Sequence, residues 1–231
     1  KLIPGCDAKL TVSPGLIELY KERYHCHFGL LRNLPSKNQT PVSPIIHSPH
    51  PIILYQGSLN IGRGLKETVR AMQYLPGYIF RIVGDGDCTD ELKFLTSTLG
   101  LDDRVEFIGP VPFEKLHWHH KNVMVGMCLL QNIGLNYYYS LPNRIFDYMQ
   151  AGIPVIASDF PDIAKIVNEY ETGLLMADMT PRHIADAIRE SCENMKWRHK
   201  WEETLPEATR KLCWENEEQI IQNLLPLKDH E

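Results

Sequence analysis

Two arginines stand at expected helix starts, in surroundings that suit an anion. Arg63 lies between Gly62 and Gly64, in a loop that begins at Gly57 and leads into an amphipathic stretch. Glycines let backbone N–H groups approach an anion closely, the amino end of a helix adds a positive dipole, and a guanidinium group can bind phosphate through two hydrogen bonds. The loop therefore suits a phosphate group, although a flexible turn with a surface arginine explains these residues equally well.

The second arginine belongs to a run in which three polar side chains share a helical face. Serine favours the N-cap position and proline the first turn, so Ser140 followed by Leu-Pro predicts a helix that begins at Leu141. Arg144 and Asp147 come four and seven residues after Ser140, which places all three on one side. Backbone N–H groups and Arg144 suit a diphosphate there, and Asp147 suits a ribose diol. The alternative is an ordinary surface pair of Arg and Asp.

A third polar turn, Gly84-Asp-Gly-Asp, follows an apolar strand. We interpret it as a structural turn, with a contact to a sugar or ribose hydroxyl as the alternative. Asp85 also follows the first glycine loop by about 20 residues, which is the spacing of a dinucleotide-binding fold. Glu67 stands where the third glycine of that fingerprint belongs, and this counts against a dinucleotide site.

The elements that must position these residues alternate regularly from Ile52 onward. Apolar strands are predicted at 52–55, 78–83, 104–108, 123–130, 154–157 and 173–176, and helices at 65–74, 91–99, 113–120, 141–149, 163–167 and 184–192. Strands that are apolar on both faces and separated by helices form a parallel sheet that is covered on both sides. The predicted fold is therefore a Rossmann-like, doubly wound α/β domain. Ligands bind at the carboxyl ends of such strands, where the three turns lie.

The first 33 residues do not belong to this alternation. Residues 1–33 form a predicted β-α-β unit, with a strand at 8–13, a helix that opens at Ser13 and an extended run from Phe28. Two parallel strands normally lie in a larger sheet, and the sequence offers them no further partners. We expect this unit to be the remnant of a preceding domain, and the chain to be part of a longer protein.

The other boundaries follow from prolines and from helical periodicity. Residues 34–51 contain five prolines and are predicted to form a linker. The α/β domain then spans residues 52–195. Residues 196–231 are predicted to be C-terminal helices, with a helical pattern throughout from Trp197 to Leu225.

Composition excludes several classes of protein. With 43% hydrophobic and 23% charged residues, the 231-residue chain is an ordinary globular protein rather than a disordered or coiled-coil one. The net charge of −5 leaves no broad basic surface for nucleic acid. No apolar run reaches the roughly 20 residues that a membrane-spanning helix needs. We therefore expect a soluble protein that binds any anion at a local site.

Cysteine and histidine usage argue against a metal. The six cysteines are scattered, which predicts free thiols in a reducing cytoplasm. His117 and His120 would share a helical face. Two imidazoles without a nearby Cys or a facing carboxylate pair are more typical of a solvated helix end than of a metal site, so we expect no metal.

Several motifs together resemble a known family in their order and spacing. They are Tyr55-Gln-Gly-Ser-Leu, Gly62-Arg-Gly-Leu, Val83-Gly-Asp-Gly, Val105-Glu-Phe-Ile-Gly, Ser140-Leu-Pro-Asn-Arg-Ile-Phe-Asp-Tyr-Met and Gln150-Ala-Gly-Ile-Pro-Val-Ile-Ala-Ser. The chain resembles glycosyltransferase family 4, the group 1 glycosyl transferases, from residue 52 to about residue 180. It is similar to the carboxyl-terminal, donor-binding domain of a GT-B enzyme. The opening unit resembles the end of the amino-terminal acceptor domain, and the closing helices resemble those that cross back toward it.

This resemblance implies a retaining transfer of a sugar from a UDP- or GDP-sugar to an acceptor hydroxyl on a glycan or lipid-linked molecule, without a cofactor or an obligatory metal. Arg63 occupies the place of the family's lysine and Arg144 that of a second basic group. Both would stabilise charge on the leaving diphosphate, which is electrostatic catalysis. Asp147 matches the second acidic residue of the family's paired motif, which holds the ribose.

The resemblance also implies the remaining donor contacts. The backbone of Asn143 would hold phosphate beside Arg144, with Ser140 nearby, and the nucleobase would lie near Gly109 to Val111. Glycines 57, 62 and 64 would form the loop around the donor.

Two positions depart from the family pattern. Tyr139 stands where the first acidic residue belongs, and Ser58 where an arginine is usual. The family's catalytic histidine and acceptor pocket belong to the amino-terminal domain, so the chain alone is expected to bind without turnover. The resemblance further implies a role in bacterial surface polysaccharide biosynthesis. It implies a cytoplasmic location, with peripheral association of the full-length protein with the inner membrane as an open alternative.

Three other functions stay open at this point. A nucleotide-sugar 2-epimerase-like isomerase resembles the same two-domain fold. A dinucleotide-binding oxidoreductase is the second alternative, although Glu67 in place of the third glycine counts against it. A non-catalytic nucleotide-binding module is compatible with the two departures from the family pattern.

Overall fold

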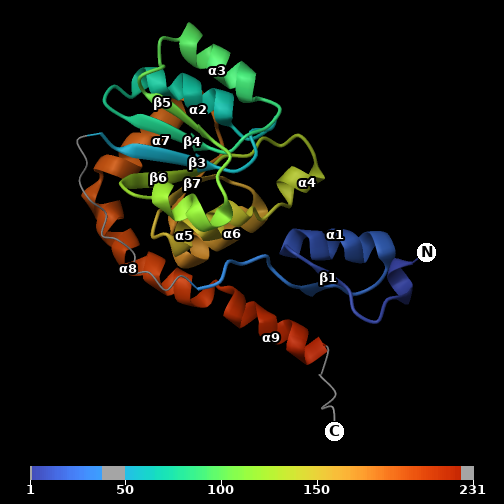
Figure 1. Cartoon of the computed structure of the whole chain (residues 1–231). Helices are drawn as coiled ribbons and strands as arrows, with labels where there is room; N and C mark the ends of the chain where they lie inside the picture. Colours follow the sequence, from blue (N-terminus) through green and yellow to red (C-terminus); the bar gives the residue numbers. More distant parts are fainter. Residues whose placement is uncertain (1, 38–49, 225–231) are drawn as a thin grey trace.

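A single parallel sheet organises the chain. The computed structural model describes residues 2–37 and 50–224, and within them one sheet has six strands in the order β5-β4-β3-β6-β7-β8, all parallel (Figure 1). Its strands are β3 Ile52–Gln56, β4 Ile79–Val83, β5 Val105–Gly109, β6 Val123–Cys128, β7 Val155–Ser158 and β8 Gly173–Met176. The predicted doubly wound α/β fold is confirmed.

Helices cover both faces of this sheet (Figure 1). One face carries α2 Leu65–Ala71, α3 Thr89–Thr98 and α7 Pro181–Glu193, and the other carries α5 Asn143–Gln150, α6 Pro161–Tyr170 and α8 Met195–Lys211. Shorter turns are the 3-10 helices η2 Met72–Tyr74 and η3 Phe113–His119 and the helix α4 Leu135–Tyr138. The two faces of β3 serve different cores: Ile53 and Tyr55 pack in one cluster, and Ile52 and Leu54 in the other. Burial on both faces explains why the strand is apolar throughout.

The strand order reverses between β3 and β6. Strands β4 and β5 extend the sheet on one side of β3, whereas β6, β7 and β8 extend it on the other. At such a switch point the connections leave the sheet in opposite directions, which opens a crevice beyond the carboxyl ends of the strands. The first glycine loop follows β3, so the topology places it at this crevice.

The expected β-α-β unit forms beside the large sheet. It consists of the 3-10 turn η1 Ile3–Gly5, then β1 Leu10–Thr11, α1 Pro14–Tyr24 and β2 Gly29–Leu30, with β1 and β2 paired in parallel as a sheet of their own. The Ser13 hydroxyl donates to the carbonyl of Tyr139 at 2.7 Å. The backbone N–H of Gly15 donates to both carboxylate oxygens of Asp162, at 3.0 and 3.1 Å. These bonds fix the start of α1 against the loop before α5 and against α6.

The C-terminal helical region is broken, so the prediction of a helix throughout was wrong. Helix α8 ends at Lys211, and α9 Trp214–Leu224 begins after a two-residue break at Leu212 and Cys213. Side chains from other parts of the chain bind the backbone carbonyls around the end of α8. Gln150 of α5 donates to the carbonyls of Thr209 and Leu212. Carbonyls at a helix end lack partners within the helix, so such donors stabilise the break.

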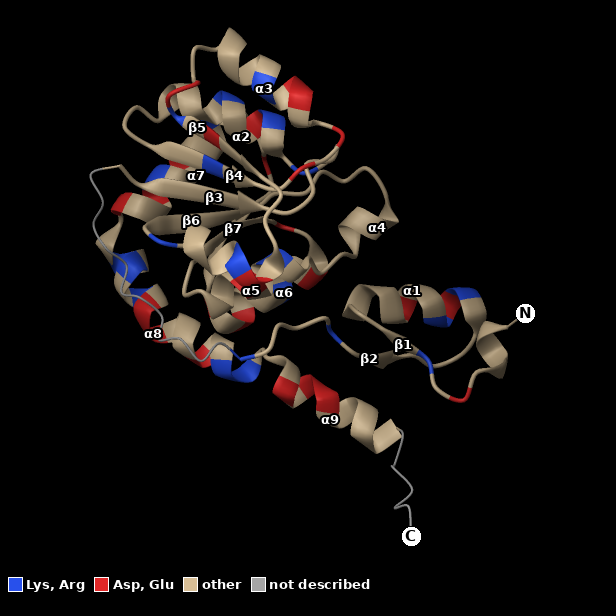
Figure 2. Ribbon diagram, in the orientation of Figure 1, with Lys and Arg blue, Asp and Glu red and all other residues tan. Residues whose placement is uncertain are grey.

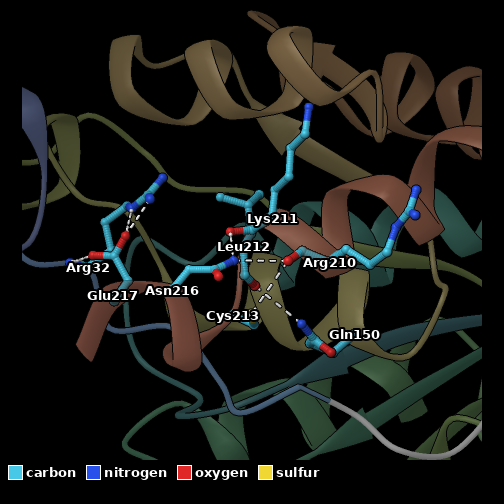
Figure 3. A network of polar contacts seen from close by, with 8 residues as sticks. All are labelled: Arg32, Gln150, Arg210, Lys211, Leu212, Cys213, Asn216 and Glu217. Carbon is cyan, nitrogen blue, oxygen red and sulfur yellow. Dashed lines mark hydrogen bonds and ion pairs between the residues drawn. The ribbon is translucent and has the colours of Figure 1, made fainter. Parts of the chain in front are cut away.

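Figure 3 shows the bonds that hold the two helices at this break. The Asn216 side chain donates to the carbonyls of Arg210 and Lys211, each at 2.9 Å. Beyond it, Glu217 is buried and forms an ion pair with Arg32, which follows β2. Helix α9 is therefore attached to the β-α-β unit. The central part of the predicted linker, 38–49, and the predicted helical residue Leu225 lie outside the described residues.

A glycine in the sheet sets how closely α5 can approach. A Cβ atom at Gly126 in β6 would overlap the ring of Tyr148, a fully buried residue of α5. We expect Gly126→Ala to lower the free energy of unfolding by about 1–3 kcal/mol, because the ring must move out of a packed core. Urea denaturation measures this change. Gly5→Ala is the matched control, since nothing lies within 4 Å of a Cβ there; equal stability of the two variants would contradict the packing argument.

Candidate functional site

A cleft of about 700 Å³ lies beyond the carboxyl ends of β3, β4 and β5 and against the start of α5. Seven of the ten predicted site residues line it: Gly57, Arg63, Val111, Ser140, Asn143, Arg144 and Asp147. The structure therefore brings together residues that are far apart in the sequence.

The other three predicted residues, all glycines, are not among its lining residues. Gly62 and Gly64 have φ values of +82° and +65°, and a Cβ on either would come within 2.6 Å of Ile133 or Leu129. Their role in the structure is to let the loop after β3 turn tightly. Gly109, with φ +83°, closes β5 just before the residues that line the cleft.

Arg144 is a buried cation held by an aromatic ring. Its guanidinium carbon lies 4.4 Å from the ring centre of Tyr55, and the residue is 9% exposed. A Cβ on Gly57 would lie 3.6 Å from Arg144 Nη2, so the glycine leaves room beside the guanidinium. Arg144 Nη1 is buried and has no hydrogen-bond partner. A charge that is stacked but only partly hydrogen-bonded retains donors for an anion.

Arg63, which also lines the cleft, is held in a similar way. Its guanidinium carbon lies 5.1 Å from the ring centre of Tyr137, whose hydroxyl donates to the carbonyl of Ile61. Arg63 Nε is also buried without a hydrogen-bond partner. Burial raises the pKa of Tyr55, and the charges of Arg144 and Arg63 both oppose that rise. Both charges therefore act electrostatically on the same hydroxyl group.

The helix that carries Arg144 begins later than the sequence predicted. Helix α5 starts at Asn143 with Pro142 as its N-cap residue, and the expected start at Leu141 with a Ser140 cap was wrong. The residue before a proline is kept out of helical conformation, so Leu141 cannot open the helix. The Ser140 hydroxyl instead donates to the carbonyl of Tyr137 at 2.8 Å, at the end of α4. The first N–H groups of a helix lack partners within it, and Asn143 brings that end to the cleft.

Asp147 lies one turn further along α5, where its carboxylate is largely buried. Gln56 Nε2 donates to Asp147 Oδ2 at 3.2 Å. Burial raises the pKa of Asp147 to about 6, against the opposing effects of the Gln56 hydrogen bond and the Arg144 charge. A carboxylate in this state gains from further hydrogen-bond donors, such as a pair of hydroxyl groups.

The sequence reasoning missed Gln56 and His120. Gln56 closes β3, is 4% exposed and lines the cleft. His120 Nε2 lies 2.8 Å from Gln56 Oε1, so one member of the His117 and His120 pair faces an amide. In the part of the chain that the structure describes, no group of three His, Cys, Asp or Glu residues could hold a metal ion. The one sequence signal for Gln56 is a polar residue at the end of an otherwise apolar strand.

The two departures from the family pattern lie in different surroundings. Tyr139 does not line the cleft; its ring packs against Gly15 of α1, where a Cβ would overlap it. Ser58 lines the cleft, and its backbone carbonyl accepts a hydrogen bond from the Tyr55 hydroxyl at 2.7 Å, a contact that does not depend on the Ser58 side chain. The position of the expected acidic residue therefore serves the contact with the β-α-β unit.

The turn after β4 is stabilised from within. Asp85 Oδ1 accepts from the backbone N–H of Gly86 and from the hydroxyl of Thr89, at 2.8 and 2.6 Å. This agrees with its interpretation as a structural turn. Gly84 and Asp85 nevertheless line the cleft, so the turn also forms part of its wall.

The chain can be assigned to a family by comparison with known proteins. Residues 37–207, more than half of the chain, match the sequence profile of the family described as "Glycosyl transferases group 1". The chain belongs to the group 1 glycosyl transferases. In the described residues no helix combines the length and apolar character that spanning a membrane requires.

Named relatives act on sugar donors or in polysaccharide synthesis. The chain is 30% identical over 111 residues to a GDP-mannose-dependent α-(1-6)-phosphatidylinositol monomannoside mannosyltransferase of Mycobacterium tuberculosis, covering 47% of this chain and 29% of that protein. It is 26% identical over 152 residues to the Vi polysaccharide biosynthesis protein VipC/TviE of Salmonella typhi, covering 64% of this chain and 25% of the relative. The chain thus spans less than a third of the length of these two relatives. Neither description supports the isomerase or oxidoreductase alternatives.

Solved structures share the fold. A sucrose-phosphate synthase from Thermosynechococcus elongatus superposes with a TM-score of 0.78 at 23% identity, covering 96% of this chain and 59% of that one. The Anabaena protein HepE, in complex with UDP-glucose, also gives a TM-score of 0.78 at 15% identity, covering 96% of this chain and 64% of its own. These matches agree with the predicted GT-B architecture.

The raised pKa of Asp147 predicts that this carboxylate destabilises the ligand-free protein at neutral pH. Its folded-state pKa of about 6 lies above the usual 3.8, so this group's contribution to stability falls as pH rises between those values. We expect Asp147→Asn to stabilise the chain at pH 8 by on the order of 2 kcal/mol, a rise in Tm of a few degrees. The gain should vanish toward pH 4.

Thermal denaturation between pH 4 and pH 8 measures this effect. Asp186→Asn is the matched control, because Asp186 is exposed and pairs with Arg189 on the surface. A surface pair contributes little, so this control should stay close to the parent at every pH. If Asp147→Asn did not raise Tm at pH 8, the ionised carboxylate would not destabilise the folded chain, which would contradict its raised pKa.

Proposed function

We propose that this chain is the donor-binding part of a retaining glycosyltransferase, which transfers a sugar from a nucleoside diphosphate sugar to an acceptor hydroxyl in bacterial surface polysaccharide synthesis. The observation that carries the proposal is the pair of ring-stacked arginines, Arg63 and Arg144, at one cleft. Each has a buried guanidinium donor without a partner. Family membership and the relatives in polysaccharide synthesis support the same conclusion.

The donor's parts match the chemistry of the cleft. The diphosphate lies at the start of α5, against the backbone of Asn143 and between the two guanidinium groups. The ribose hydroxyls donate to Asp147, and the base lies near Val111, after β5. As the bond to the sugar breaks, negative charge grows on the leaving diphosphate, and Arg63 and Arg144 stabilise it. In this proposal the two cations compensate the phosphate charge, so no metal or cofactor is required.

The donor class follows from relatives and neighbours. HepE holds UDP-glucose, and the Mycobacterium tuberculosis relative depends on GDP-mannose. We therefore propose a UDP- or GDP-sugar. The acceptor site and the catalytic histidine are assigned to an amino-terminal domain of the full-length protein, which acts in the cytoplasm at the membrane surface. The chain by itself then binds donor without turning it over.

Binding of UDP or GDP tests the donor site. At about 100 times Kd, a ligand stabilises the folded chain by about 2.7 kcal/mol, which raises Tm by roughly 5–10 °C at this size. We expect one of the two nucleotides to produce such a shift, and Arg63→Met and Arg144→Met each to abolish it. Differential scanning fluorimetry measures Tm.

Arg70→Met is the matched control for these two variants. Arg70 lies in α2, the helix that begins just after Arg63. Its side chain is exposed and does not line the cleft. This variant should keep the full shift. Folded protein that responds to neither nucleotide would refute the proposal.

Retention of configuration is tested on the full-length protein. With an α-linked nucleotide sugar as donor, we expect an α-linked product, and proton NMR of the first-formed product identifies the anomer. A β-linked product would show an inverting enzyme and contradict the retaining assignment.

A further inference from the structure

Three polar side chains from separate elements form a continuous chain of hydrogen bonds that ends at the cleft. His120 Nε2 lies 2.8 Å from Gln56 Oε1, and Gln56 Nε2 donates to Asp147 Oδ2 at 3.2 Å. His120 follows η3, Gln56 closes β3, and Asp147 lies in α5. The fold therefore brings together three elements that are far apart in the sequence.

The direction of every hydrogen in this chain follows from Asp147. An ionised carboxylate can only accept, so Gln56 must turn its NH₂ group toward it. The amide oxygen of Gln56 then faces His120, and an oxygen there can only accept. His120 must therefore carry its hydrogen on Nε2 and donate it.

Burial keeps this arrangement in place. Gln56 is 4% exposed, and its backbone N–H donates to the Tyr148 hydroxyl at 3.1 Å. Burial also lowers the pKa of His120 to about 4, and the charges of His117 and His119 act in the same direction. His120 is therefore neutral at physiological pH, which leaves a single Nε2 hydrogen to orient the amide.

We propose that Gln56 and His120 are positioning residues for the nucleotide's ribose, and this rests on the function proposed above. Gln56 binds Asp147 Oδ2 and leaves Oδ1 to accept from a hydroxyl group. His120 prevents the amide of Gln56 from turning its oxygen toward the carboxylate. Arg144 is the charged group that acts on Asp147 from α5 itself.

The test compares a probe that has a ribose with one that does not. We expect His120→Phe, which keeps a ring but removes the donor, to weaken binding of UDP or GDP about tenfold. Binding of inorganic pyrophosphate, which depends on the arginines, should change less than twofold. His120→Gln restores an N–H donor and should recover most of the nucleotide affinity. Isothermal titration calorimetry measures the affinities of the parent and both variants for the nucleotide and for pyrophosphate.

A second measurement needs no ligand. Carboxyl-carbon NMR of the free chain gives the pKa of Asp147, and we expect it to rise in His120→Phe and return toward the parent value in His120→Gln. Gln56→Met removes the amide directly and should raise the pKa of Asp147 as His120→Phe does. The two variants test the same contact, so the test still works if one of them fails to fold.

The outcomes separate the two proposals. Unchanged nucleotide affinity and an unchanged Asp147 pKa in His120→Phe would overturn the positioning role, as would an equal loss of pyrophosphate and nucleotide binding. A parent chain that binds neither UDP nor GDP would overturn the proposed function. The Asp147 pKa comparison would then still decide whether His120 orients this carboxylate through Gln56.

Discussion

The site depends on two arginine charges that lack a carboxylate partner, and each has a buried N–H donor without a hydrogen bond. In the described part of the chain neither Arg63 nor Arg144 forms an ion pair, and each lies instead over a tyrosine ring. A buried charge without a counter-ion is costly, and a ring face recovers only about 1–2 kcal/mol of that cost. The rest of the domain must supply the difference, and in the proposed function the donor's diphosphate provides the missing counter-charge. Such a local conflict is expected at a functional site rather than in a scaffold.

The scaffold that holds these charges is rigid because backbones approach closely at the strand ends. A Cβ at Gly84 would overlap the carbonyl of Gly57, so β3 and β4 can end side by side beneath the cleft. The carboxyl-terminal part of α5 is fixed by two contacts: the Tyr148 hydroxyl accepts from the backbone of β3, and Gln150 donates to a carbonyl near the end of α8. Figure 2 shows charged residues on the outer helices as well; Arg63 and Arg144 differ from them because both line the cleft and each keeps a buried N–H there without a partner. A rigid base lets a buried cation keep one orientation, which a surface lysine or arginine does not.

Much of the fold was visible in the sequence because burial on both faces leaves a local signal. Apolar runs predicted the strands, and the rule that ligands bind at their carboxyl ends predicted that Arg63 and Arg144 would meet. Local rules failed where two of them competed, as at Ser140, where the restriction before a proline outweighed the capping preference of serine. They also failed where distant side chains take part: at the break after α8, Gln150 donates to the carbonyl of Leu212. The bond between Gln56 and His120 joins residues 64 apart and has no local signature.

One short segment joins the cleft to the β-α-β unit. Tyr137 lies over Arg63, and its neighbour Tyr139, two residues later, accepts from Ser13 through its carbonyl and packs its ring on Gly15. The two contacts point from the same turn of chain toward different parts of the molecule. Because α4 has only four residues, Tyr137 and Tyr139 cannot move independently of each other. The position of α1 and the ring that covers Arg63 are therefore mechanically connected, which gives Tyr139 a structural reason to stand where an acidic residue was expected.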